Sequence, residues 1–391
     1  MVVKMENAMA MRLSRSIVGE AEADAVRRVI REDGYLGMGS EVQRFERDLA
    51  TYLGVAEDHV ITTNSGTAAL HLAVQAILDC VPPVSDGQAE ILVPSLTFVA
   101  SFQAIGAGGG TPVPCEIRPD TGTIDLEDAA RRLTPRTRAI MPVHYASNPA
   151  DLDAVYAFAA AHGLRVIEDA AHAFGCRWKG RRIGSFGDVI CFSFDGIKNI
   201  TCGEGGCIVT ADAAVAALCR DARLLSVKND SEKRFAGSRS WDFDVDRQGW
   251  RYHMSNIMAA IGRTQLARLD GEFAPARRAL AARYRERLKD LAGVRPLTPA
   301  PEAEIIPHIF PVRIAGGLRQ AVADALAARG IPTGRHYKPN HLLSLYGGGR
   351  LSLPVTEQFF AEILTLPLHP GLTPDDVDAV CDSIAGVVEK G

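Results

Sequence analysis

Six short apolar stretches, separated by polar or helical sequence, constrain the fold of this chain more than any other feature. They span residues 91–93, 112–116, 139–144, 165–168, 189–194 and 207–210. Runs this short that lack polar alternation are typical of strands buried on both faces. Several of the intervening segments, notably residues 152–162, have the apolar spacing of a helix. The alternation predicts an α/β fold with a mostly parallel central sheet and helices on both faces.

The sequence also indicates where the chain divides. Residues 14–31 have the pattern of an amphipathic helix, with acidic residues early and arginines late. From Asp270 onward the character changes, beginning with an Ala- and Arg-rich helix at residues 272–291. We predict a large domain over residues 13–270 and a smaller C-terminal α+β domain over residues 271–391. The N-terminal helix is expected to pack on the smaller domain.

Composition excludes several classes of function. A formal net charge of −4 over 391 residues gives no basic field for nucleic acid or an anionic membrane. The eight cysteines form no C-x-x-C pair, which is typical of reduced core residues in a cytosolic protein. The first 12 residues lack the apolar stretch of a signal peptide, and no run approaches the length of a membrane span. We therefore expect a soluble, cytoplasmic protein of enzyme size.

One lysine lies between two of the apolar stretches. Lys198 occupies a Gly-punctuated turn, with residues 189–194 before it and residues 207–210 after it. Burial lowers the pKa of a lysine, and a lysine that loses its proton near neutral pH becomes a nucleophile. The alternative is an ordinary exposed loop lysine, which is the commoner situation for a lysine in a loop.

Four further features lie at strand ends or in a strand. The sequence Asn64-Ser65-Gly66-Thr67 joins a strand to a helix and presents N–H groups and a hydroxyl, suited either to a phosphate or to plain helix capping. Asp169 follows a strand at the edge where open α/β sheets bind ligands, although a cap or ion pair is also possible. Phe98 could be a core residue or a flat platform for a ring, and Ser193 is a lone hydroxyl in an apolar strand.

These features together match one cofactor. A phosphate site, an aromatic platform, a buried carboxylate and an isolated lysine are what pyridoxal 5′-phosphate (PLP) needs. The sequence has no G-x-x-x-x-G-K-[ST] motif and no G-x-G-x-x-G after a predicted strand, which argues against a nucleotide-triphosphate enzyme and a Rossmann dehydrogenase.

A set of ordered motifs also resembles a known family. The chain is similar over nearly its whole length to the DegT/DnrJ/StrS nucleotide-sugar aminotransferases, PLP-dependent enzymes of fold type I. The motifs that carry the resemblance are S-G-T-A-A-L-H-L, P-S-L-T-F-V-A-S, V-I-E-D-A-A-H-A-F-G, F-S-F-D-G-I-K-N-I-T-C-G-E-G-G, M-S-N-I-M-A-A-I-G-R-T-Q-L and G-I-P-T-G-R-H-Y-K-P-N-H.

The resemblance implies a role for each candidate residue. Lys198 would hold the cofactor covalently, Asp169 would pair with its ring nitrogen, and His172 would approach its phenolic oxygen. Phe98 would stack on the ring. The phosphate would be bound by Ser65, Gly66, Thr67 and Ser193.

The chain departs from the family at one position. Where the family has G-[YF]-N-[YF]-R-M, the segment here reads Gly249-Trp250-Arg251-Tyr252-His253-Met254, with Arg251 in place of the Asn that reaches the partner subunit's cofactor phosphate. Arginine can bind a phosphate through two hydrogen bonds, so the role could persist or strengthen. Alternatively, the role has moved to Asn256 or is lost. The resemblance further implies donor and sugar contacts, which we expect from Tyr35, Arg251, His336, Tyr337 and His341.

The resemblance implies transfer of an amino group from L-glutamate to a nucleotide-linked keto-sugar, in a homodimer with shared active sites. Two substrates that alternate in one site predict ping-pong kinetics. The T-C-G-E-G-G sequence after the lysine resembles members that act at C4 of a 4-keto-6-deoxy sugar more than those that act at C3. Alternatives are a sugar dehydratase of the same fold, which carries histidine in place of the lysine, and a cofactor-binding sensor without turnover.

Overall fold

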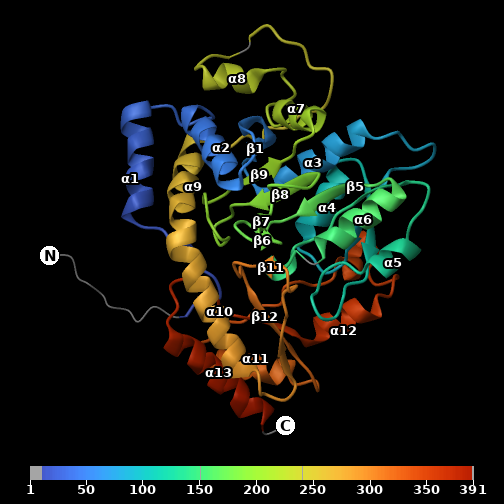
Figure 1. Cartoon of the computed structure of the whole chain (residues 1–391), viewed down its shortest axis with the longest axis vertical. Coiled ribbons are helices and arrows are strands. Elements are labelled where there is room, and N and C mark those ends of the chain that lie inside the picture. The colour runs from blue at the N-terminus through green and yellow to red at the C-terminus, as the bar shows by residue number, and fades with distance from the viewer. Residues whose placement is uncertain (1–10, 150, 240, 390–391) are drawn as a thin grey trace, which may run out of the picture.

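A seven-stranded sheet forms the centre of the protein, as described by a computed structural model that covers residues 11–149, 151–239 and 241–389 (Figure 1). The strand order is β1-β9-β8-β5-β4-β2-β3, and β9 alone runs antiparallel to its neighbours. This confirms the predicted mostly parallel sheet. The strands are β1 (Val60–Thr63), β2 (Glu90–Pro94), β3 (Thr111–Cys115), β4 (Thr137–Ile140), β5 (Arg165–Asp169), β8 (Val189–Ser193) and β9 (Gly206–Val209).

Helices cover both faces of this sheet because successive strand residues point to opposite sides. In β8, Val189 and Cys191 pack in one hydrophobic cluster, whereas Ile190 and Phe192 pack in another. On the first face lie α3 (Gly66–Cys80), α4 (Val99–Ala107) and α7 (Ala213–Ala222). The opposite face is covered by α2 (Ser40–Leu53) and α9 (Asn256–Arg268), with α5 (Leu126–Arg131) and α6 (Leu152–His162) farther along the sheet.

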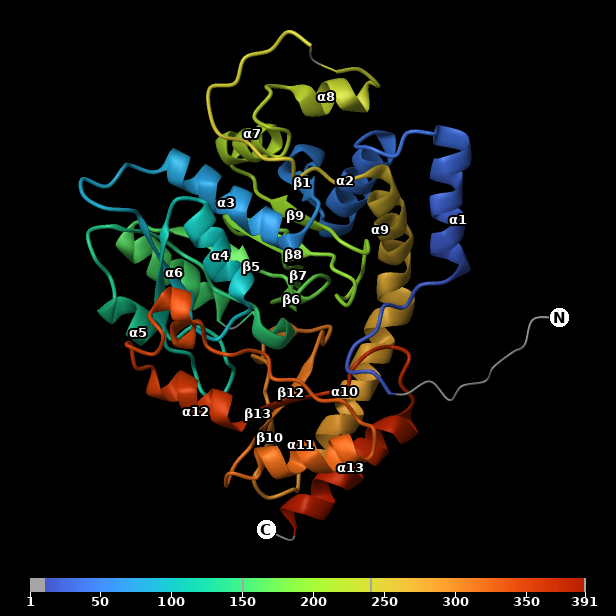
Figure 2. The same ribbon diagram turned by 180° about the vertical axis from the view of Figure 1, so that it is seen from behind.

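The C-terminal part of the chain surrounds a second, smaller sheet (Figure 2). Its antiparallel strands have the order β10-β12-β13, and the buried residues of their hydrophobic cluster all lie between Leu280 and Ile384. A two-residue strand, β11, pairs with the β6–β7 hairpin of the large domain. The elements of this part are α10 (Ala274–Leu288), β10 (Val294–Pro296), β11 (Ala303–Glu304), β12 (Phe310–Ile314), α11 (Arg319–Ala328), α12 (Pro354–Glu362), β13 (Ile363–Leu366) and α13 (Pro374–Val388), and the hairpin strands are β6 (Arg177–Trp178) and β7 (Arg181–Arg182).

The N-terminal helix differs from its prediction in extent and in packing partner. Helix α1 spans only Glu20–Arg28 and continues as one π-helical turn, Val29–Asp33, because the extended backbone of Gly19 starts the helix late. Its small apolar stripe, Ala25 and Val29, packs on Ala260 of α9 in the large domain. The expected packing of this helix on the smaller domain is therefore wrong. Residues just before the helix reach that domain, where the carbonyl of Leu13 accepts a hydrogen bond from Leu368 N.

All eight cysteines are free and seven are buried, with Cys80 exposed, which confirms their interpretation as unpaired and mostly core residues. Among the described residues, no helix is both long and apolar enough to cross a membrane. Residues 1–10, on which the expectation of no signal peptide depends, lie outside the described residues.

Candidate active site

The predicted phosphate turn lies between β1 and α3. Ser65 is the N-cap of α3, and its hydroxyl accepts a hydrogen bond from Ala68 N at 3.1 Å. The next residue must be glycine, because a Cβ on Gly66 would lie 2.7 Å from Cβ of Ser193. The first N–H groups of an α-helix have no partner within the helix, and they point outward at its positive end. Gly66 and the exposed Thr67 therefore offer an anion site beside Ser193.

Asp169 ends β5 and is held in a fixed orientation. The side chain is buried, and its Oδ2 accepts a hydrogen bond from Ser101 Oγ at 2.6 Å. Its Oδ1 accepts a second bond, from Ala171 N at 3.2 Å. Hydrogen bonds to a carboxylate are stronger than neutral ones, so this pair fixes the side chain at the carboxyl edge of the sheet. A carboxylate held there can pair with a protonated ring nitrogen.

Lys198 lies in the loop between β8 and β9, as predicted, and its surroundings lower the pKa of its amine. The residue is half-buried, and its Nζ is 3.4 Å from His308 Nε2. Burial lowers the pKa of Lys198 to about 8, although the carboxylates of Asp195 and Asp169 act in the opposite direction. A substantial fraction of the amine is therefore unprotonated at slightly alkaline pH, as a nucleophilic lysine requires.

Two further histidines, on which the charge of this lysine acts, are uncharged at neutral pH. His172 is buried, and its Nε2 is 3.1 Å from the hydroxyl of Tyr337. Burial, followed by the charge of Lys198, holds the pKa of His172 well below its usual range. The same two causes lower the pKa of His336 to about 4. His172, His336 and Tyr337 thus belong to one group with Lys198, and this group joins both domains.

Phe98 lies immediately after the turn that follows β2. Its side chain is 55% exposed, which is unusual for a phenylalanine, and its ring centroid is 5.5 Å from that of Tyr337. The residue is therefore not part of the core, and an uncovered aromatic face at the carboxyl edge of the sheet can stack on a planar ligand.

Two other predicted contact residues lie apart from this group. Tyr35 lines a pocket with Arg239, whose Nη2 is 3.4 Å from the tyrosine hydroxyl. Arg251 is exposed and lines an adjoining pocket beside His253, to which Arg239 also contributes. Asn256, the alternative for the phosphate role, is fully buried and bonds through its Oδ1 to Gly39 N at 3.0 Å and through its Nδ2 to Tyr35 O at 2.8 Å. Asn256 therefore ties the Gly-rich loop to α9 and is not free to reach a ligand.

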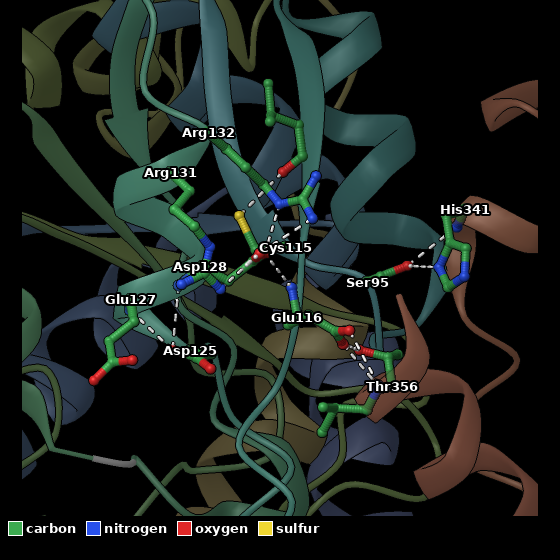
Figure 3. Close-up of polar contacts among 12 residues, drawn as sticks. Ser95, Cys115, Glu116, Asp125, Glu127, Asp128, Arg131, Arg132, His341 and Thr356 are labelled. Carbon is green, nitrogen blue, oxygen red and sulfur yellow. Dashed lines mark hydrogen bonds and ion pairs between the residues drawn. The ribbon is translucent and has the colours of Figure 1, made fainter. Parts of the chain in front are cut away.

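His341, which we expected to contact substrate, lies buried between β2 and α12 (Figure 3). Its ring has no exposed surface. Nδ1 is 2.7 Å from Ser95 Oγ at the end of β2, and Nε2 is 3.3 Å from Glu357 in α12. Nearby, the carboxylate of Glu116 caps α12 by accepting from Thr356 N at 2.8 Å. His341 thus uses both ring nitrogens to link β2 to α12, and its expected contact with substrate stays a prediction.

The assembled residues fit PLP by their donor set and by their close packing. The site offers a helix N-terminus for a phosphate, an orientated carboxylate, an exposed aromatic face and a lysine with a lowered pKa. In the large domain, the glycines around the phosphate turn leave no room for a side chain: a Cβ on Gly206 would lie 2.6 Å from Ser65 O. Buried Nδ1 of His172 also has no hydrogen-bond partner among the described residues.

Comparison with known proteins identifies the family. The sequence model of the DegT/DnrJ/EryC1/StrS aminotransferase family matches residues 16–385. The chain belongs to this aminotransferase family. It is a PLP-dependent sugar aminotransferase, which confirms the predicted enzyme class and cofactor.

Solved structures resemble this aminotransferase over almost its full length. DesV of S. venezuelae is 36% identical, with a TM-score of 0.84 and 94% of each chain covered. PseC of Helicobacter pylori, an aminotransferase involved in the biosynthesis of pseudoaminic acid, is 26% identical, with a TM-score of 0.88 and coverage of 98% of this chain and 100% of PseC. Spr1654 of Streptococcus pneumoniae, in its PLP form, is 27% identical, with a TM-score of 0.86 and coverage of 97% and 99%. The fold-type-I prediction is thereby confirmed.

Two residues of the aminotransferase site were not predicted from the sequence. Ser101 is the third residue of α4 and orients Asp169 from 68 residues away. His308 contacts Lys198 from 110 residues away, in the segment between β11 and β12. The one signal for His308 is its position as a lone titratable residue in the apolar stretch Ile305-Ile306-Pro307-His308-Ile309.

Proposed function

We propose that this enzyme moves an amino group from L-glutamate to C4 of a nucleotide-linked 4-keto-6-deoxyhexose, alternating the two substrates in one site. The observation that carries the proposal is the lowered pKa of Lys198, about 8, in a loop beside Asp169 at the carboxyl edge of the sheet. The glutamate donor and the choice of C4 rest on the family resemblance and on the T-C-G-E-G-G sequence that follows the lysine. The role of PseC in pseudoaminic acid biosynthesis supports an amino-sugar product.

Each residue of the site has a distinct task in this scheme. Bound PLP supplies a ring that accepts the electron pair left when the donor's α-carbon loses its proton. Lys198, once released from its covalent link, takes that proton on Nζ and later returns one. Asp169 keeps a proton on the ring nitrogen through a charge-assisted hydrogen bond. His172 stays uncharged because of its burial, and so presents a neutral imidazole to the ring's oxygen.

The remaining residues bind and shield the cofactor. Phe98 presents its exposed face for stacking. The hydroxyls and N–H groups of the β1–α3 turn and of β8 hold the phosphate, through Ser65, Gly66, Thr67 and Ser193.

Two substitutions and a substrate panel test this proposal. Lys198→Ala is expected to abolish turnover and the borohydride-fixable attachment of PLP, whereas Lys228→Ala, at an exposed lysine, should leave both unchanged. The panel offers keto-sugar nucleotides with glutamate and identifies the product by mass and NMR. Amination at C3 would overturn the C4 assignment, and a deoxygenated product would indicate a dehydratase.

We infer further that the enzyme is a homodimer in which Arg251 completes the partner's phosphate site. Arg251 is exposed and lies outside the group around Lys198. The same segment carries large exposed apolar side chains, with Trp241 at 84% and Phe243 at 55% exposure, which are typical of a surface that another chain covers.

Subunit mixing tests the shared site. Lys198→Ala and Arg251→Ala subunits are each expected to be inactive, but a mixed dimer retains one site with both native residues. Random mixing should therefore restore about a quarter of the wild-type activity. Mixtures that stay inactive while heterodimers form would contradict the sharing of sites.

A further inference from the structure

A histidine that has no task in the proposed scheme lies against Lys198. His308 Nε2 is 3.4 Å from Lys198 Nζ, and the His308 ring is packed on the ring of His172 with centroids 4.5 Å apart. The side chain is buried, with 2% exposure. It comes from the segment that precedes β12 of the smaller sheet, so it approaches the lysine from the domain opposite to that of Lys198.

The ring of His308 is not needed to hold its own segment. The main chain does this, because His308 N donates to Ser147 Oγ at 2.9 Å and His308 O accepts from Arg277 Nη1 at 3.1 Å. Nδ1 of the ring has no hydrogen-bond partner among the described residues. A histidine retained for the fold would use its ring nitrogens to satisfy buried groups, as His341 does with Ser95.

The charges around this pair decide which atom donates. Burial, followed by the charge of Lys198, holds the pKa of His308 well below its usual range, so its imidazole is neutral at pH 7. A lysine ammonium has donors only, whereas a neutral imidazole always has one accepting nitrogen. Nε2 is the ring nitrogen that faces Nζ. The charged or titratable groups that act on the two side chains are His172, His336, Arg277, Asp169 and Asp195.

We propose that His308 is a positioning residue for Lys198, whose released ammonium group donates a hydrogen bond to Nε2 and is thereby held in the site while it carries the proton. The proposal rests on the role of Lys198 given above. Two effects then set the pKa of Lys198: burial lowers it by disfavouring the charged amine, and the accepting imidazole raises it by favouring that form. Removal of the acceptor should therefore lower the pKa of Lys198 further.

Two variants isolate the accepting nitrogen. His308→Phe keeps a planar ring without an acceptor, whereas His308→Gln keeps a polar group of similar reach that does not titrate. In the cofactor-free, full-length protein, the pKa of Lys198 is measured from its rate of acetylation by acetic anhydride between about pH 6 and 11, read by peptide mass spectrometry. Exposed Lys228 is the internal control.

The size of the expected pKa shift follows from the free energy that a hydrogen bond to a charged group contributes. In His308→Phe the pKa of Lys198 should fall by about 1–2 units, and in His308→Gln by less than about half a unit, with Lys228 unchanged in both. If His308→Phe does not fold, as judged by circular dichroism, His308→Leu takes its place. A purely structural histidine would lower stability in these variants without shifting the pKa of Lys198.

A second measurement separates failure of this proposal from failure of the proposed function. Wild-type protein is loaded with PLP and treated with borohydride, and the labelled peptide is identified. If label does not appear on Lys198, the proposed function fails whatever the variants show. If Lys198 is labelled but its pKa in the acceptor-free variant stays within about 0.3 units of wild type, the positioning role of His308 is overturned.

Discussion

Replacement of Gly206 by alanine should displace the backbone of the phosphate turn between β1 and α3. Gly206 begins β9 and pairs with Thr63 of β1 and Ser193 of β8, the strands that carry the turn and its hydroxyl. A Cβ at this position would lie 2.6 Å from Ser65 O and 2.7 Å from Gly66 N. Both atoms belong to the backbone, so they cannot rotate away as a flexible side chain would.

The size of the effect follows from these distances. Non-bonded contacts to carbon are most favourable at about 3.5–4.0 Å, so the turn or β9 must move by roughly 1 Å. Overpacking of this kind lowers the free energy of unfolding by about 1–3 kcal/mol. If the displaced N–H groups of Gly66 and Thr67 each lose a bond to a charged phosphate, the affinity for PLP should fall by at least about tenfold.

Two titrations measure these changes. Urea unfolding of the cofactor-free protein gives the free energy of unfolding, and an absorbance titration with PLP gives the dissociation constant. Gly106→Ala is the matched control, because a Cβ on Gly106 in α4 meets nothing within 4 Å. That substitution should leave PLP affinity unchanged and stabilise the helix by up to about 1 kcal/mol. Wild-type stability and PLP affinity in Gly206→Ala would refute both the tight packing and the location of the phosphate site.

Three further predictions concern the site and the core. Ser101→Ala removes the 2.6 Å hydrogen bond to Asp169 and should slow the glutamate half-reaction about tenfold in stopped-flow absorbance; an unchanged rate would show that Asp169 does not depend on it. Arg223→Met removes the ion-pair partner, 2.5 Å away, of the buried Glu46 carboxylate, and should lower the free energy of unfolding by about 3–5 kcal/mol in urea titrations. A loss below about 1 kcal/mol would contradict a stabilising buried ion pair. Because the pKa of Lys198 is lowered from 10.5 to about 8, the unfolded chain binds an extra proton between these values. The cofactor-free wild type should therefore gain stability relative to Lys198→Met as pH rises through that window, and a constant difference would contradict the lowered pKa.

The sequence by itself determined the sheet and the positions of the residues at its carboxyl edge. The apolar stretches specify the strands because a strand buried on both faces must be continuously apolar over a few residues. Once β1, β5 and β8 are placed, the residues at and beyond their carboxyl ends lie at one edge, which is why local pattern alone marked Ser65, Asp169 and Lys198 as candidates.

Only the tertiary structure decided which distant side chains meet these residues. Ser101 reaches Asp169 and His308 reaches Lys198 through packing between elements 68 and 110 residues apart, and no local periodicity encodes such a pairing. The same holds for His341, whose surroundings come from β2 and α12. A short motif specifies the backbone conformation of its own residues, but burial, and with it the protonation of a buried histidine or lysine, depends on every element that packs around the side chain.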